Sequence, residues 1–229
     1  MTTQQLLSFT RKAVDQYGMI REGDKIGVGV SGGKDSLTLA VALKGLQRFY
    51  PKHFELVCYT VSLGFPGTDF SSIEAFMAEQ GIEYHVIQTD IGQVVFDERK
   101  EENPCSLCSK MRKGALNDAA KADGCTTIAL GHNMEDVVES FLMSLLHEGR
   151  LHTFQPVTHW DRMDLYAIRP LIFAHEQDIL YYANKNNLPI VKNPCPANGF
   201  TKRETMKGLI DYITKNISPN ARERFITRY

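Results

Sequence analysis

Residues 25–36 read Lys-Ile-Gly-Val-Gly-Val-Ser-Gly-Gly-Lys-Asp-Ser, and this stretch decides the predicted fold. Its first half is an apolar run typical of a buried strand, and residues 36–48 have the apolar periodicity of a helix. The glycines in between therefore form a tight strand-to-helix turn, where backbone N–H groups and the helix N-terminus attract anions. We expect the turn to bind a phosphate-bearing nucleotide.

Two other glycine motifs compete for the same residues. The dinucleotide fingerprint GxGxxG fits residues 27–32, but its first two glycines fall inside the predicted strand rather than in the turn. The next strand also ends in residues 61–63, Val-Ser-Leu, which lack the acid that would hold a ribose. A Walker loop requires glycine in place of Val28 and serine or threonine in place of Asp35. Both are set aside, and a structural turn with polar caps remains as the alternative to ATP binding.

The side chains of the turn supply further groups for ATP. Ser31 and Ser36 carry hydroxyl donors, Lys34 a positive charge, and Asp35 a carboxylate suited to the magnesium ion that accompanies ATP. Lys34 and Asp35 are therefore candidate catalytic residues that stabilise charge on the phosphates, with Asp35 as the magnesium ligand. The candidate nucleotide-binding residues are Ser31, Gly32, Gly33, Lys34, Asp35 and Ser36.

The alternation of strand and helix continues along the chain. Further strands are predicted at residues 56–62, 84–88, 126–130 and 165–169, and further helices at 69–80, 106–122, 135–147 and 176–186. This order predicts an α/β fold with a doubly wound parallel sheet covered by helices on both faces. Residues 90–104 and 149–160 are expected to be loops.

Three regions follow from this pattern. Residues 1–24 form an N-terminal helix that Thr2 or Thr3 caps, residues 25–190 form the ATP-binding domain, and residues 191–229 form a tail. The tail begins with an irregular, proline-rich cysteine loop and ends in one or two basic helices.

Composition excludes several classes of protein. The 229 residues are 43% hydrophobic and 23% charged, the balance of an ordinary soluble globular protein. No apolar run approaches the roughly 20 residues that cross a bilayer, and the N-terminus lacks a secretion signal, so we expect a cytoplasmic protein without membrane contact. The net charge of −1 means that any RNA contact must be local. Candidate patches are residues 110–113 and the segment from Gly199 onward, with a solvated helix face as the alternative.

The five cysteines point to a metal or redox site, because an odd number in a reducing compartment argues against a disulfide framework. Cys105 and Cys108 open a helix, whose N-terminus and following cations should lower both thiol pKa values. Cys195, in the irregular loop, is a third candidate ligand, whereas Cys58 and Cys125 read as core residues. Three thiolates suit an iron–sulfur cluster with one open iron better than a closed structural zinc site. The spacing of the cysteines alone does not distinguish between a zinc site, an iron–sulfur cluster and a dithiol redox pair.

The loop Ser31-Gly32-Gly33-Lys34-Asp35-Ser36 resembles the signature of PP-loop ATP pyrophosphatases, in the form typical of the branch that modifies tRNA. The resemblance implies a Rossmann-like fold of the adenine nucleotide alpha hydrolase type. It also implies that a substrate oxygen attacks the α-phosphate of ATP and pyrophosphate leaves. Adenine is then expected over residues 59–63, including Val61.

The turn Gly131-His132-Asn133-Met134-Glu135-Asp136 is similar to a second motif of the same branch. Its position after a strand places it near the first loop if the two strands are neighbours. The resemblance implies that Asp136 is a catalytic residue contacting metal or substrate, and that Gly131 and His132 contact the nucleotide. Capping of a helix N-terminus is the alternative for Glu135 and Asp136.

Residues 25–209 resemble the 2-thiocytidine synthetase group of tRNA thiolases, in a shorter form. Supporting segments are Gly64-Phe65-Pro66-Gly67, Ile168-Arg169-Pro170-Leu171 and Thr201-Lys202-Arg203-Glu204. The resemblance implies a [4Fe–4S] cluster on Cys105, Cys108 and Cys195, and phosphate or RNA contacts by Arg169 and Arg203. One departure is that Ala197 and Asn198 stand where better-known members carry a second CxxC, as in a shorter subgroup.

The expected reaction is ATP-dependent thiolation of tRNA: a cytidine O2 is adenylated and then replaced by sulfur delivered through the cluster. Cofactors are ATP, Mg²⁺ and the [4Fe–4S] cluster. Expected partners are tRNA, a sulfur donor that is sulfide or a cysteine desulfurase, and a second copy of the chain in a homodimer. Alternatives are lysidine synthetase-like or 2-thiouridine-type modification, or a non-catalytic ATP-responsive iron–sulfur sensor or sulfur carrier.

Overall fold

The structure is a computed structural model that describes residues 1–99, 104–191, 195 and 202–227. Within these residues six strands form one sheet, in the order β3-β2-β1-β4-β6-β5. Neighbouring strands are parallel except for the edge pair β5 and β6, which is antiparallel. The strands are β1 (Asp24–Gly29), β2 (Phe54–Ser62), β3 (Glu83–Gln88), β4 (Thr127–Ala129), β5 (Val157–Trp160) and β6 (Leu165–Ile168). The predicted α/β fold is confirmed.

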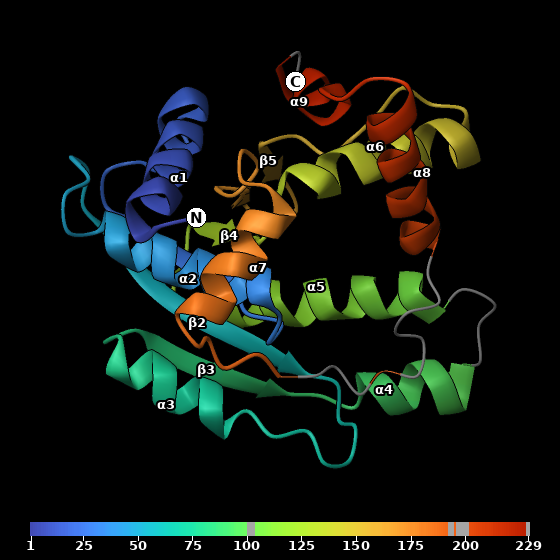
Figure 1. Ribbon diagram of the computed structural model, residues 1–229. Helices are drawn as coiled ribbons and strands as arrows, with labels where there is room; N and C mark the ends of the chain where they lie inside the picture. Colours follow the sequence, from blue (N-terminus) through green and yellow to red (C-terminus); the bar gives the residue numbers. More distant parts are fainter. Residues whose placement is uncertain (100–103, 192–194, 196–201, 228–229) are drawn as a thin grey trace.

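Helices cover both faces of the sheet (Figure 1). Leu6, Leu39 and Ile179 belong to the larger core, so the helices that carry them pack on one face. Leu116 and Ala120 pack against Tyr59 and Ile128 on the other face. The main helices are α1 (Thr3–Tyr17), α2 (Lys34–Leu46), α3 (Ser71–Glu79), α5 (Pro104–Ala122), α6 (Met134–Glu148) and α7 (Glu176–Lys185).

The strand order reverses at β1, and this topology places two loops side by side. β2 lies on one side of β1 and β4 on the other, with Val28 of β1 opposite Ala129 of β4. The loops that follow β1 and β4 therefore leave from the same carboxyl edge, where open α/β sheets bind ligands. The predicted nearness of residues 31–36 and 131–136 follows from this topology.

The C-terminal helices α8 (Lys202–Asn216) and α9 (Ala221–Thr227) pack beside α6 (Figure 1). Val138 and Leu142 of α6 form a small apolar cluster with Met206 and Ile210 of α8. This cluster holds the first turn of α8 beside the turn between β4 and α6, which becomes important for the site.

Two of the expected loops differ from the structure. Residues 91–99 are helical, as α4 (Ile91–Gln93) and a π-helical segment (Val94–Arg99). Ile91 and Val95, four residues apart, bury one face of this segment against Cys108, an apolar spacing that the surrounding charges obscure in the sequence. Residues 157–160, expected in a loop, form β5, because they pair with β6 at the sheet edge. In the described part of the chain, no helix has the length and apolar content to span a membrane.

Candidate functional site

The nucleotide loop joins β1 to α2 with an open helix N-terminus. Gly32 has a φ of +83°, a left-handed conformation that favours glycine. Gly33 is the N-cap residue of α2, and among the described residues no side chain caps this helix end. The first N–H groups of α2 and its dipole are therefore directed at the loop, as an anion site requires.

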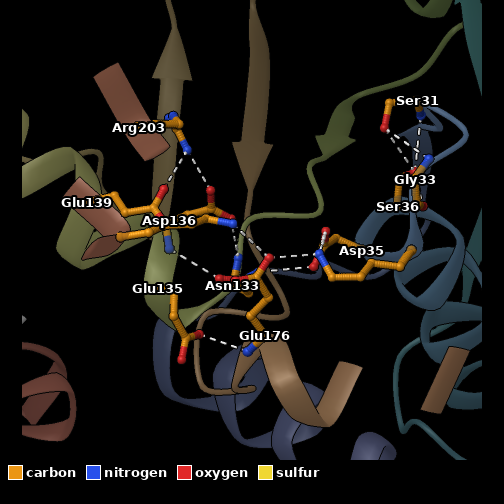
Figure 2. Close-up of polar contacts among 12 residues, drawn as sticks. Ser31, Gly33, Asp35, Ser36, Asn133, Glu135, Asp136, Glu139, Glu176 and Arg203 are labelled. Atoms are coloured by element: carbon orange, nitrogen blue, oxygen red, sulfur yellow. Dashed lines mark hydrogen bonds and ion pairs between the residues drawn. The ribbon is translucent and has the colours of Figure 1, made fainter. Parts of the chain in front are cut away.

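The two serines of the loop brace it from inside. Ser36 Oγ accepts a hydrogen bond from Ser31 N at 3.1 Å and donates one to Gly33 O at 3.0 Å. Ser31 Oγ lies 3.3 Å from Ser36 Oγ, and Figure 2 shows both hydroxyls inside the turn. Val191 N donates to Gly32 O at 3.0 Å, so Val191 is bonded to this loop.

The turn after β4 contacts the loop directly. Asn133 Nδ2 donates to Asp35 Oδ1 at 3.0 Å, while Lys34 Nζ donates to Asp35 Oδ2 at 2.8 Å (Figure 2). Gly131 lies against the first turn of α2: a Cβ there would stand 3.0 Å from the Asp35 carbonyl carbon and from Ser36 N. Gly131 thus permits the close approach of the two loops.

We expect Gly131→Ala to lower activity by about 10- to 100-fold, because displacement of a reacting group by about 1 Å has an effect of that order. The added methyl group meets backbone atoms of the nucleotide loop, so the loop itself must move. Steady-state pyrophosphate release measures the effect. Gly114→Ala is the control, because its methyl group would meet no atom within 4 Å and α5 should tolerate it. Equal activity of the two variants would contradict the prediction.

The acids of this turn combine structural and site contacts. Asp136 Oδ2 accepts a hydrogen bond from Asn133 N at 3.0 Å in a capping box, so Asp136 does help to cap the N-terminus of α6. Its Oδ1 meanwhile accepts from the guanidinium of Arg203 on α8 (Figure 2). Glu135 caps α7 instead, since its Oε2 accepts from Glu176 N at 2.8 Å.

A cleft with a volume of about 400 Å³ opens beside the loop. It brings together candidate residues from different elements, including Ser31, Val61, His132 and Arg169. The remaining lining residues are Gly29, Val30, Tyr59, Ser109, Arg112, Lys113, Leu116, Leu130 and Trp160. Residues of the strand ends thus form one wall, and the positively charged face of α5 forms another.

His132 is a neutral residue in the wall of this cleft. Burial, reinforced by the positive charges of Arg169 and Arg203, lowers its pKa to about 3. Arg169 Nε donates to His132 Nδ1 at 3.2 Å, which assigns the ring proton to Nε2. The ring also stacks on Phe154, with 4.7 Å between centroids. At neutral pH His132 therefore offers an N–H donor and no charge.

Cys105 and Cys108 lie at the start of α5, and Cys195 interacts electrostatically with Cys108. Cys105 is exposed and Cys108 is buried on the first turn of that helix. Burial raises the pKa of the Cys108 thiol, Arg112 opposes this, and the thiolates of Cys195 and Cys105 raise the pKa further, so both lie within electrostatic reach. The expectation that helix dipole and cations lower the pKa of Cys108 is wrong, because burial outweighs them.

The other cysteines lie away from this group. Cys58 and Cys125 are 0% and 2% exposed, so both are core residues as predicted. In the described ranges, no three His, Cys, Asp or Glu side chains are already arranged as ligands of a metal ion. The residues adjoining Cys195 at 192–194 and 196–201, which include Ala197 and Asn198, lie outside the described residues.

Comparison with known proteins agrees with this geometry. The family model described as the PP-loop domain matches residues 2–208. The chain belongs to the PP-loop family. A relative from Geobacter sulfurreducens named tRNA-cytidine(32) 2-sulfurtransferase is 37% identical over 207 residues, which are 89% of this chain and 80% of the relative. One of the same name from Syntrophotalea carbinolica is 33% identical, covering 97% and 87%. The chain thus belongs with the tRNA-cytidine(32) 2-sulfurtransferases.

Solved structures support the same assignment. The U34-tRNA thiolase NcsA from Methanococcus maripaludis, determined with its [4Fe–4S] cluster, superposes with a TM-score of 0.80 and 26% identity. The match covers 99% of this PP-loop chain and 76% of NcsA. An NH3-dependent NAD synthetase from Campylobacter jejuni shares the fold alone, with a TM-score of 0.53 and 14% identity.

The PP-loop family signature does not reveal several residues of the site. Glu139, Glu176 and Lys207 join the network around Lys34 and Asp136, but they are isolated charges on helices in the sequence. The sequence predicts Arg112 and Lys113 in a basic patch and near the two thiols, but not in the cleft that they line. The spacing of these two from Cys108 on one helix is the signal that would have placed them.

The basic tail is less available to RNA than its composition suggests. Arg203 pairs with Asp136 and Glu139, and Lys207 pairs with Glu176. Arg222 pairs with Asp211 and approaches Glu135. These cations of α8 and α9 therefore face carboxylates of the protein, so neither a solvated face nor a continuous RNA-binding surface describes them fully.

Glu139 makes the stability of the site dependent on pH. Its side chain is 2% exposed, and burial, with the neighbouring Asp136 carboxylate, raises its pKa from 4.5 to about 7. Between these values the folded protein binds a proton that the unfolded chain does not, so stability falls as pH rises through about 7. We expect this group to remove on the order of 3 kcal/mol between pH 4.5 and 8, at about 1.4 kcal/mol per pH unit.

Glu139→Gln should abolish that part of the pH dependence. Urea unfolding at pH 5 and pH 8 of wild type and variant measures it, because contributions of other titrating groups cancel in the difference. A variant whose free energy of unfolding falls with pH as steeply as that of the wild type would refute this assignment.

Proposed function

We propose that this chain is an ATP-dependent tRNA sulfurtransferase that acts on a cytidine, at position 32 as in the named relatives. One observation carries the proposal. Helix α5 bears Cys105 and Cys108 on its first turn and lines the cleft beside the nucleotide loop one turn later, with Arg112 and Lys113. A substrate base in this cleft would be within reach of both an activating nucleotide and a sulfur site.

ATP would bind with its phosphates on residues 31–36 and its adenine near Val61. Asp35, whose carboxylate faces the loop, would hold the magnesium ion. A [4Fe–4S] cluster fits Cys105, Cys108 and Cys195 by donor chemistry, since three thiolates would hold three of its irons and leave one iron without a protein ligand. When bound, the cluster would supply the sulfur for transfer.

The proposed reaction has two steps, adenylation of the base and displacement of AMP by sulfur. The O2 atom of cytidine attacks the α-phosphorus of ATP, the bond to the β-phosphate oxygen breaks, and pyrophosphate leaves. A sulfide sulfur next attacks C2 of the base, the C2–O2 bond breaks, and AMP departs with that oxygen. Lys34 and the N-terminus of α2 stabilise negative charge on the phosphates during the first step.

The residues around the base have distinct tasks. Neutral His132 offers its Nε2–H to the cleft, and Arg169, which orients the ring, adds positive charge there. Asp136 holds Arg203 beside the turn, and we propose that both contact substrate or its phosphates after ATP binds. Burial of His132 and Arg169 strengthens their electrostatic contacts with a substrate in the cleft.

The resemblance to NcsA supports a second candidate, formation of 2-thiouridine at a uridine of tRNA. Uracil also presents an O2 atom, so the adenylation chemistry would be unchanged. We favour cytidine because the relatives that match at 33–37% identity carry that name.

The test is reconstitution with defined substrates. Protein is loaded anaerobically with iron and sulfide, then incubated with ATP, magnesium chloride, sulfide and a tRNA transcript carrying cytidine at position 32. Nucleoside mass spectrometry should detect 2-thiocytidine, with one AMP formed per thiolated base. A transcript with uridine at that position is the matched control. Thiolation of only a uridine would select the second candidate, and absence of any thiolated base would refute the function.

We also propose a cytoplasmic location, where tRNA and a cysteine desulfurase or sulfide would be encountered. A homodimer remains our expectation for the assembled enzyme. Size-exclusion chromatography with light scattering measures the assembly state directly.

A further inference from the structure

Glu176, the first residue of α7, connects the nucleotide loop to the C-terminal helix. Its Oε1 accepts a hydrogen bond from Lys34 Nζ at 3.0 Å and another from Lys207 Nζ at 3.0 Å. The backbone N–H of Glu176 is bonded to Glu135, which holds the first turn of α7 in place. One carboxylate therefore lies between ammonium groups from α2 and α8, and its contact with Lys34 spans 142 residues of sequence.

Lys34, Glu176 and Lys207, which form a salt bridge of three groups, are all charged at neutral pH. Burial lowers the pKa of Lys34, but Asp35 and Glu176 outweigh burial and raise it overall. Burial likewise raises the pKa of Glu176, whereas the two lysines outweigh it and lower the value. The side chains of Lys34 and Glu176 are 20% and 28% exposed, so solvent only partly screens their attraction.

Lys34 has a second carboxylate partner besides Glu176. Asp35 also contacts the Lys34 ammonium, at 2.8 Å, but Asp35 is the group we assign to magnesium. A metal ion would compete with Lys34 for that carboxylate, which leaves Glu176 as the remaining restraint. A lysine has a long flexible stem, so a restraint of this kind lowers the entropy that it loses on binding phosphate.

Helix α8 keeps the Glu176 carboxylate in place. Arg203 and Lys207 stand one turn apart on α8, where the first contacts Asp136 and the second contacts Glu176. The same face of α8 thus supports two acids of the site, and Figure 2 shows these acids beside Asn133 and Asp35.

We propose that Glu176 is a positioning residue for adenylation: it holds the Lys34 ammonium at the nucleotide loop, and Lys207 fixes its carboxylate. The inference rests on the proposed function. Glu176 carries negative charge near the triphosphate, so its removal should leave ATP binding intact while the misplaced Lys34 slows the chemical step. The expected signature is a loss in kcat without a matching loss in ATP affinity.

The experiment compares Glu176→Gln, Glu176→Asp and Asp178→Asn in the full chain. Asp178 lies in the same first turn of α7, and Asp178→Asn removes the same charge as Glu176→Gln. Asp178, however, pairs with the Met1 amino group rather than with Lys34. Pyrophosphate release with tRNA gives kcat, calorimetric titration with AMPCPP gives nucleotide affinity, and acetylation of Lys34 at pH 8 reports the contact itself. Thermal melts check folding.

Glu176→Gln should lower kcat by about 10- to 100-fold and change AMPCPP affinity by less than about 3-fold. Lys34 should be acetylated at least about 3-fold faster, because its Nζ loses the hydrogen bond to the Glu176 carboxylate. Glu176→Asp should recover part of kcat, and Asp178→Asn should match wild type. A parallel loss of kcat, affinity and melting temperature, or no change in kcat, overturns the inference.

Failure of the proposed function is recognised separately. If the wild type releases no pyrophosphate with any tRNA, the sulfurtransferase assignment is wrong and kcat carries no information on Glu176. The acetylation rate then decides: faster labelling of Lys34 in Glu176→Gln but not in Asp178→Asn supports the positioning contact, and equal rates refute it.

Discussion

Cys195→Ser should abolish formation of 2-thiocytidine while isotope exchange between pyrophosphate and ATP continues. A serine hydroxyl is not deprotonated at neutral pH and does not replace a thiolate as an iron ligand. Outer-shell substitutions at metal sites cost about 10- to 100-fold, so loss of a direct ligand should cost at least as much. Thiolated nucleoside is measured by mass spectrometry, and iron and sulfide content by chemical assay.

Cys58→Ala provides the matched control for this prediction. Cys58 is 0% exposed and lies in the main core, away from the start of α5, so this variant should keep iron, sulfide and thiolation. Exchange should persist in Cys195→Ser because the nucleotide loop is bonded to Val191 through backbone atoms, which this substitution leaves unchanged. Retention of thiolation by Cys195→Ser, or loss of cofactor by both variants, would remove Cys195 from the site.

Asp35→Asn should lower the rate of pyrophosphate release by about 10²- to 10³-fold. The substitution removes the carboxylate we assign to magnesium and the partner of Lys34 at 2.8 Å. Both contacts stabilise charge that develops on the phosphates, and loss of one such group commonly costs that much. Single-turnover pyrophosphate release at saturating ATP measures the chemical step.

Asp69→Asn is the control for Asp35→Asn. Asp69 is an acid in the loop before α3, and its described contacts are to Ser71. Its amide variant should keep the wild-type rate. A tenfold or smaller effect of Asp35→Asn, at saturating magnesium, would mean that Asp35 orders Asn133 and Lys34 without taking part in the reaction.

The chemistry of this site follows from short motifs whose structure is local. A buried strand, two glycines and a helix start at residues 25–36 dictate an anion-binding turn, because backbone N–H groups and helix dipole do not depend on distant partners. The second turn at 131–136 follows the same rule, and strand order brings the two together. The pair of cysteines at the start of α5 is equally local.

Long-range contacts decided what the motifs left open. The sequence left open whether Asp136 is a cap or a site residue. The structure shows that one of its oxygens caps α6 while the other accepts from Arg203 of α8. Glu135 resembled its neighbour in the motif, yet it caps α7. Isolated charges such as Glu176 carry no signal until packing places their partners.

The sequence alone determined the α/β order of elements, the nucleotide loop and the cysteine pair at 105 and 108, because glycine conformation, apolar periodicity and thiol chemistry reside in adjacent residues. The family resemblance added Cys195 as the third candidate ligand of a cluster. The tertiary structure decided the edge strand β5, the raised pKa of Cys108 and the bridge from Lys34 through Glu176 to Lys207. Each of these depends on burial and on charges brought together from distant parts of the chain, and both are properties of packing.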